Sequence, residues 1–261
     1  MSYYIAALLA STIGFLLFYK LWTVYPWRGK KYALFVFPLT LLFSVVVNIY
    51  VKQPSYAYIL DKLDISGSIR YWPLWFLFFG IGIGAFWEEL IKILPAVIDK
   101  YAVKEKIDVY YLSLFCGLGF GIGEALFLAE RMAGYYPNYA PYGTGAAQII
   151  LSSGGERLFS IIFHIVATGI AGYGIAVNKP LRFFLLAVFC HTMTNFPIGL
   201  YQKGLMSIPA VLIGVNTGMA IFYGLMFYLF FAKIDLSLKS AFRKAMVDKI
   251  DKVTLFKREG W

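Results

Sequence analysis

The sequence predicts an all-α fold, a polytopic membrane bundle of about seven transmembrane helices. Of its 261 residues, 60% are apolar and only 15% are charged. The mean hydropathy of +0.70 excludes a soluble domain, which would need far more polar surface at this length. Seven apolar runs approach or exceed the roughly 20 helical residues that cross a bilayer. These runs are residues 3–24, 32–51, 71–98, 109–131, 156–178, 181–200 and 207–232.

The first run starts close to the N-terminus, as MSYYIAALLASTIGFLLFYKLW. No basic segment precedes it, and its apolar part is about twenty residues long, so we interpret it as a retained span and not as a cleaved signal peptide. An odd number of spans places the two chain ends on opposite sides of the membrane. With the C-terminus inside, the cytoplasmic ends of the spans and the tail collect seventeen Lys and Arg residues, and the opposite ends collect six. This asymmetry predicts an N-out, C-in orientation.

Two of the runs contain closely spaced glycines, GIGIG at 80–84 and GLGFGIG at 117–123. No strand–turn–helix context surrounds them, so a phosphate-binding loop is not indicated. Small residues let helices approach closely, and we expect these two spans to pack against each other. The segment 134–148, rich in Tyr, Gly and Pro, is expected to be a loop or a shallow re-entrant element.

The spans form one predicted domain, residues 1–235, which is followed by a basic tail, residues 236–261. We interpret the tail as an amphipathic helix that lies on the anionic cytoplasmic leaflet; a docking surface for a partner protein is the alternative. Basic residues are confined to short loops and this tail, so the expected partner is the lipid bilayer and not nucleic acid. One face of the tail carries Leu238, Phe242, Ala245, Met246, Ile250 and Val253.

The interiors of the spans contain few strongly polar residues. The stretch FWEELIKILPA carries three of them, and the others are Glu124, His164, His191 and Asn195. Charge at bilayer depth costs several kcal/mol, so such residues indicate a function. At about 1.5 Å of helical rise per residue, Glu89, Glu124 and the two histidines lie about 14 to 23 Å from the cytoplasmic edge. Four helices can therefore bring them into one layer.

Helical spacing predicts which of these side chains share a face. His191 and Asn195 are i,i+4 neighbours and can address one ligand. Lys92 lies one turn beyond both Glu88 and Glu89, so it can neutralise one carboxylate while the other faces the site. On the fifth run a polar seam, expected to face the interior of the bundle, consists of Arg157, Ser160, His164 and Thr168.

Imidazoles and carboxylates without a nucleophilic serine or cysteine indicate that the site activates water. Histidines and a carboxylate can hold Zn²⁺ with one position open, and a further glutamate then takes a proton. A metal-free mechanism is the alternative, with a buried glutamate as general base and with His191 and Asn195 donating hydrogen bonds to an oxyanion. Any single one of these polar residues could instead form a hydrogen bond that holds two helices together. HExxH is absent, so soluble zincin chemistry is not indicated.

Four motifs occur in order along the chain: Glu88-Glu89-x-x-Lys92, Phe120-x-x-x-Glu124, His164, and His191-x-x-x-Asn195. Their order resembles the intramembrane metalloprotease superfamily of CAAX proteases and bacteriocin-processing or immunity membrane proteins. The CAAX branch has EExxxR and a histidine at the second motif. Lys92 and Glu124 therefore place the chain nearer the PrsW-like and YhfC-like branches, and GFGIGE with ERLFSIIFH resembles the YhfC-like branch most.

The resemblance implies proteolysis of membrane-protein or membrane-associated peptide substrates, in a multi-pass protein of the bacterial plasma membrane. It implies that Glu88 is the base, oriented by Lys92, with Glu89 in a supporting role. It implies that Glu124, His164 and His191 act as metal ligands or as polarising groups. The whole catalytic set would be Glu88, Glu89, Glu124, His164, His191 and Asn195. Two other functions remain open: a proton- or cation-coupled transporter, and a non-catalytic immunity or scaffold protein.

Overall fold

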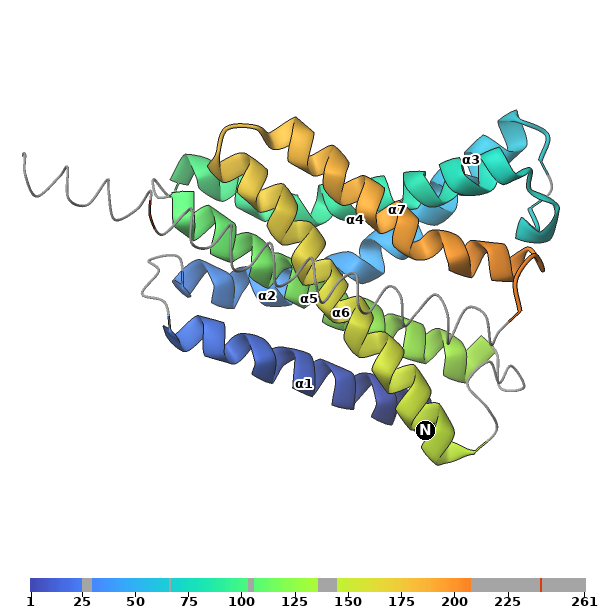
Figure 1. Ribbon diagram of the computed structural model, residues 1–261, viewed down its shortest axis with the longest axis horizontal. Helices are drawn as coiled ribbons and strands as arrows, with labels where there is room; N and C mark the ends of the chain where they lie inside the picture. The colour runs from blue at the N-terminus through green and yellow to red at the C-terminus, as the bar shows by residue number, and fades with distance from the viewer. Residues whose placement is uncertain (25–29, 66, 103–105, 136–144, 208–239, 241–261) are drawn as a thin grey trace, which may run out of the picture.

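The structure is a computed structural model, and it describes residues 1–24, 30–65, 67–102, 106–135, 145–207 and 240 (Figure 1). These residues are helical apart from short connections, and they contain no strand. The elements are α1 (Ser2–Val24), α2 (Lys30–Val46), the π-helical segment η1 (Val47–Lys52), α3 (Gln53–Lys62), the 3-10 turn η2 (Ile69–Tyr71), α4 (Leu74–Ala102), α5 (Lys106–Tyr135), α6 (Ala146–Ala176) and α7 (Pro180–Gln202).

Within the described chain, five helical stretches are long and apolar enough to cross a membrane. They are Tyr32–Lys62, Leu74–Ile98, Asp108–Gly134, Ala146–Ala176 and Pro180–Gln202. The all-α membrane bundle is therefore confirmed, and α1 coincides with the first predicted run. Apart from residues 207 and 240, the seventh run and the tail lie outside the described residues. The count of seven and the N-out, C-in orientation stay predictions.

Two spans differ from their predicted bounds. The second continues to Lys62, because α2, η1 and α3 follow one another without a break. Pro54 does not interrupt this helix, since it lies in the first turn of α3. The fifth span begins at Ala146 and not at 156, so the end of the predicted 134–148 loop is helical. Gly154, inside this helix, lies against Ala6 of α1 and so serves helix packing.

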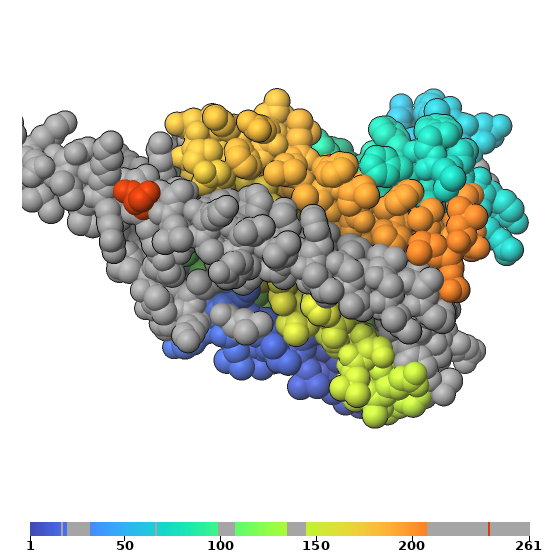
Figure 2. All heavy atoms as spheres, in the orientation of Figure 1, coloured from blue at the N-terminus to red at the C-terminus, as the bar shows by residue number. Residues whose placement is uncertain are grey.

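Helices α5 and α6 form the centre of the bundle. Most of their residues are buried, with α1 and α2 on one side and α4 and α7 on the other (Figure 1). By contrast, α7 exposes large apolar side chains, and it forms part of the surface seen in Figure 2. Exposed apolar faces of this kind suit contact with lipid, because lipid tails are as apolar as the side chains.

The glycines of α5 let this helix pack closely against α2 and α6. Gly117 and Gly121 face α6, whereas Gly119 and Gly123 face α2. In α4 the equivalent glycines face other neighbours: Gly82 lies beside Thr192 of α7, and Gly84 lies beside Lys52 and Tyr56. The two glycine-rich spans do pack against each other as predicted, since α4 contacts α5, but their glycines face other neighbours. Helical spacing correctly identified the glycine-rich faces of these helices, but not which neighbouring helices those faces contact.

We expect Gly117→Ala to destabilise the protein. The added Cβ would lie 2.5 Å from the carbonyl oxygen of His164 and 2.7 Å from Cα of Ile165, and backbone atoms cannot move aside cheaply. Overpacking of this kind costs about 1–3 kcal/mol. Gly134→Ala, on the same helix, is the control because nothing lies within 4 Å of its new Cβ. Thermal unfolding in detergent measures both, and equal midpoints would contradict the close α5–α6 contact.

Candidate active site

A cluster of charged and imidazole side chains lies in the interior of the bundle. Helix α4 supplies Glu88, Glu89 and Lys92, α5 supplies Glu124, α6 supplies His164 and α7 supplies His191. The exposed fractions are 1% for Glu88, 0% for Glu89 and Lys92, 1% for His164 and 2% for His191. The structure thus brings together the residues that the depth argument placed in one layer.

His164 is held between an acid and a base. Its Nε2 lies 2.7 Å from Oε2 of Glu124, and its Nδ1 lies 2.9 Å from Nζ of Lys92. A lysine ammonium only donates hydrogen bonds, so Nδ1 accepts and Nε2–H donates to Glu124. The hydroxyl of Ser160 also donates to Oε2 of Glu124, at 3.4 Å. The polar seam predicted on this helix therefore does face the interior.

His191 is oriented by Glu89. Its Nδ1 lies 2.7 Å from Oε1 of Glu89, and because a carboxylate only accepts, Nδ1–H is the donor. The lone pair on Nε2 then faces Oε2 of Glu88 at 3.5 Å. That oxygen is buried and has no hydrogen-bond partner among the described residues. Two acceptors that face each other across this gap need a proton donor or a cation between them.

Each of the adjacent glutamates has its own lysine. Nζ of Lys92 lies 2.5 Å from Oε1 of Glu89, three residues earlier on the same helix. Glu88 instead pairs through Oε1 with Lys52 of η1. The prediction that Lys92 orients Glu88 is therefore wrong. Lys52 was missed because the second span was expected to end at residue 51; the i,i+4 pair of Asn48 and Lys52 was the available signal.

Aromatic rings surround the two imidazoles. The rings of His164 and His191 are 5.3 Å apart and nearly perpendicular, at 76°. Phe163 meets His191 edge-on at 4.9 Å, and Phe120 lies 5.3 Å from His164. Nζ of Lys92 sits 5.1 Å from the centroid of Phe120, a favourable place for a cation over a ring. This packing restricts the imidazole rotamers.

A buried Glu/His/His group in the cluster could hold a metal ion. One ligand atom from each of Glu88, His164 and His191 lies within 4.8 Å of the others. Glu124, predicted as the third ligand, instead accepts the hydrogen bond from His164. Asn195 lies one turn beyond His191, is half-buried, and makes no hydrogen bond to another residue in the described part of the chain. Among the described residues, no hydrogen bond therefore joins it to the cluster.

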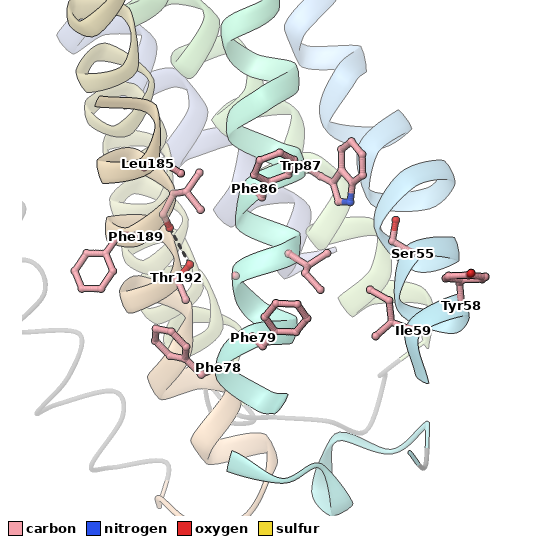
Figure 3. Close-up of a pocket in the computed structure, with 13 residues that line it drawn as sticks. Ser55, Tyr58, Ile59, Phe78, Phe79, Phe86, Trp87, Leu185, Phe189 and Thr192 are labelled. Atoms are coloured by element: carbon pink, nitrogen blue, oxygen red, sulfur yellow. Dashed lines mark hydrogen bonds between the residues drawn. The ribbon is translucent and has the colours of Figure 1, made fainter. Parts of the chain in front are cut away.

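An apolar groove of about 660 Å³ runs beside the cluster, between α3, α4 and α7 (Figure 3). Tyr58 and Ile59 line it from α3, Trp87 from α4, and Phe189 and Thr192 from α7. Trp87 directly precedes Glu88, and Thr192 directly follows His191. Sequence reasoning did not find this groove, because apolar residues in a span look alike whether they line a groove or face lipid.

Fold and site together define the class: a helical membrane protein with an acid–histidine–lysine cluster in its interior. Four of the five described helices that could cross a membrane supply that cluster. Comparisons of the chain with protein families, with curated proteins and with solved structures find no match.

Proposed function

We propose that this protein is an intramembrane protease of the bacterial plasma membrane, which hydrolyses peptide bonds of membrane-associated substrates with water activated by Glu88. The observation that carries the proposal is the unpartnered Oε2 of Glu88, buried in the bundle and facing Nε2 of His191 at 3.5 Å. A carboxylate held this way is a general base that lacks only its water.

The chemistry follows from the two facing acceptors. A water molecule has two O–H donors, so it can bond to both Oε2 of Glu88 and Nε2 of His191. Glu88 takes one proton as the water oxygen attacks the carbonyl carbon of the peptide. It returns that proton to the amide nitrogen when the C–N bond breaks, which leaves a carboxylic acid and an amine. Charge and atoms balance without another reactant.

Two further carboxylates act through the histidines. Glu89 accepts the Nδ1–H of His191, which directs the Nε2 lone pair to the reaction site. Glu124 accepts the Nε2–H of His164 and fixes that ring in the same way. A carboxylate behind a histidine commonly sets its tautomer and orientation, both in hydrolases and in metal sites.

The cluster also suits a metal ion. Glu88, His164 and His191 would hold it, and two histidines with one carboxylate are a donor set that favours Zn²⁺. When bound, zinc would supply Lewis acidity towards water or a carbonyl oxygen. Oε2 of Glu88 and Nε2 of His191 are open to a ligand, whereas both nitrogens of His164 are engaged. In the mechanism without zinc, Glu88 is the only base that acts on the water.

Zinc is therefore expected to raise the thermal unfolding midpoint of the wild-type protein. A ligand that binds only the folded state at a hundred times its Kd adds about 2.7 kcal/mol of stability. The double variant Glu88→Gln/His191→Ala should lose this shift, because it lacks two of the three donors. Magnesium is the control ion, since it prefers oxygen ligands. A wild-type protein that does not respond to zinc would support the metal-free mechanism.

Proteolysis itself is tested without a known substrate. The purified protein is reconstituted into vesicles together with solubilised bacterial membrane proteins, and new peptide N-termini are labelled and identified by mass spectrometry. Wild-type protein should generate termini that Glu88→Gln protein does not. If the two samples give the same termini, the protein does not cleave membrane proteins in these vesicles, and the protease proposal fails.

One observation favours a proton-coupled transporter as the second candidate. Ion pairs and hydrogen bonds link Lys92 to Glu89 and His191 on one side and to His164 and Glu124 on the other. Linked titratable groups at membrane depth are typical of proton relays. Proton uptake into the same vesicles, lost in Glu124→Gln but not accompanied by new N-termini, would support transport instead of proteolysis.

A further inference from the structure

We propose that Lys52 is the positioning residue of Glu88: it fixes the rotation of the carboxylate so that Oε2 faces His191. This inference rests on the proposed function. Lys52 belongs to none of the four motifs, and it comes from the second span, which supplies none of the six residues of the cluster.

The backbone around Lys52 departs from a regular α-helix. Residues Val47–Lys52 form a π-helical segment inside the long second span. Such segments are rare and concentrate at functional sites, because the wider turn re-aims a side chain. The wider turn also changes which carbonyls are paired, and the side-chain amide of Asn48 donates to the carbonyl of Ser44 at 2.7 Å. The irregular turn is thus stabilised locally.

Asn48 also aims the lysine. Its Oδ1 accepts a hydrogen bond from Nζ of Lys52 at 3.0 Å, and the same Nζ donates to Oε1 of Glu88. Gly84, one turn before Glu88, makes room for Tyr56 and for the lysine: an added Cβ there would lie 2.3 Å from the hydroxyl of Tyr56 and 3.2 Å from Cε of Lys52. The π-helical turn, the side-chain amide of Asn48 and the space left by Gly84 therefore all fix the position of the Lys52 ammonium group.

This arrangement leaves one carboxylate oxygen free. Oε1 of Glu88 is occupied by Lys52, while Oε2 has no partner and faces His191. The side chain of Lys52 is 18% exposed and that of Glu88 is 1% exposed, so the ammonium approaches from the edge of the cluster and the base stays inside it. Without the lysine, the carboxylate could rotate away from His191.

The inference predicts a loss of kcat with unchanged KM. Lys52 does not line the apolar groove, so its removal should not affect substrate binding there. A catalytic group displaced by about 1 Å can cost about a hundredfold in rate, and we expect a kcat loss of that order for Lys52→Met. Lys52→Arg keeps a cation and should recover much of the rate. Lys179→Met, which replaces an exposed lysine directly before the helix of His191, is the matched control and should equal wild type.

The assay follows a peptide cleaved by the wild-type protein, chosen from the N-terminus experiment. A Lys52→Met protein with unchanged kcat, or with raised KM alone, would overturn the inference. Thermal unfolding of Lys52→Met, Glu88→Gln and the double variant tests the pairing independently of activity, because paired residues give non-additive shifts. Additive shifts would also overturn it. If wild-type protein cleaves nothing, the proposed function fails, and the positioning role fails with it even where the shifts show coupling.

Discussion

Glu88→Gln is expected to lower the rate of peptide cleavage by at least about a hundredfold, because a general base contributes roughly 10²–10⁴-fold. Glutamine keeps the shape of the side chain but cannot take a proton from water. The loss should appear in kcat, since the apolar groove that would bind the substrate does not include Glu88. The loss is measured as the rate at which a peptide in vesicles is cleaved, with equal amounts of folded wild-type and variant protein.

Glu89→Gln is the informative comparison for this prediction. Oε1 of Glu89 contacts His191 and Lys92, and its Oε2, like Oε2 of Glu88, has no hydrogen-bond partner among the described residues. Because it is Oε2 of Glu88 that lies 3.5 Å from Nε2 of His191, replacement of Glu89 should cost less than that of Glu88. If Glu88→Gln cleaves at nearly the wild-type rate and Glu89→Gln does not, the two roles are reversed. If neither change affects cleavage, the protease proposal should be abandoned for a binding or immunity role.

Lys92→Met is expected to cause the largest loss of stability, about 3–5 kcal/mol, the usual cost of removing one partner from a buried ion pair. Lys92 is fully buried and contacts both Glu89 and His164. Its replacement leaves the charge of Glu89 inside the bundle with only the hydrogen bond from His191. Unfolding in a denaturing detergent, followed by circular dichroism, gives the change in free energy.

Two variants make the Lys92 result specific. Lys179→Met removes an exposed lysine of similar size and should change stability by less than about 1 kcal/mol, as surface pairs and charges usually do. Adding Glu89→Gln to Lys92→Met removes the unpaired charge and should restore part of the loss. A Lys92→Met protein as stable as the Lys179→Met protein would mean that the contacts of Lys92 with Glu89 and His164 do not stabilise the bundle.

The sequence by itself determined the class of fold and the members of most of the site. Apolar runs of membrane length predicted helices, and the structure describes helices at the first six runs. Charge is so costly in such runs that Glu88, Glu89, Lys92 and Glu124 stood out without any knowledge of their neighbours. The constant rise of a helix then placed them at a common depth with both histidines.

Only the tertiary structure decided which of these groups meet. Helical periodicity says which residues share a face, but every face has several candidate neighbours, and the energy that selects one comes from contacts between helices distant in sequence. For this reason three features were not predictable: which of the two glutamates pairs with Lys92, the replacement of Glu124 by Glu88 in the metal-binding group, and the partners of the α5 glycines. The contact of Lys52 with Glu88 depends further on a π-helical turn, which changes the face that Lys52 shares and has no reliable signature in residue spacing.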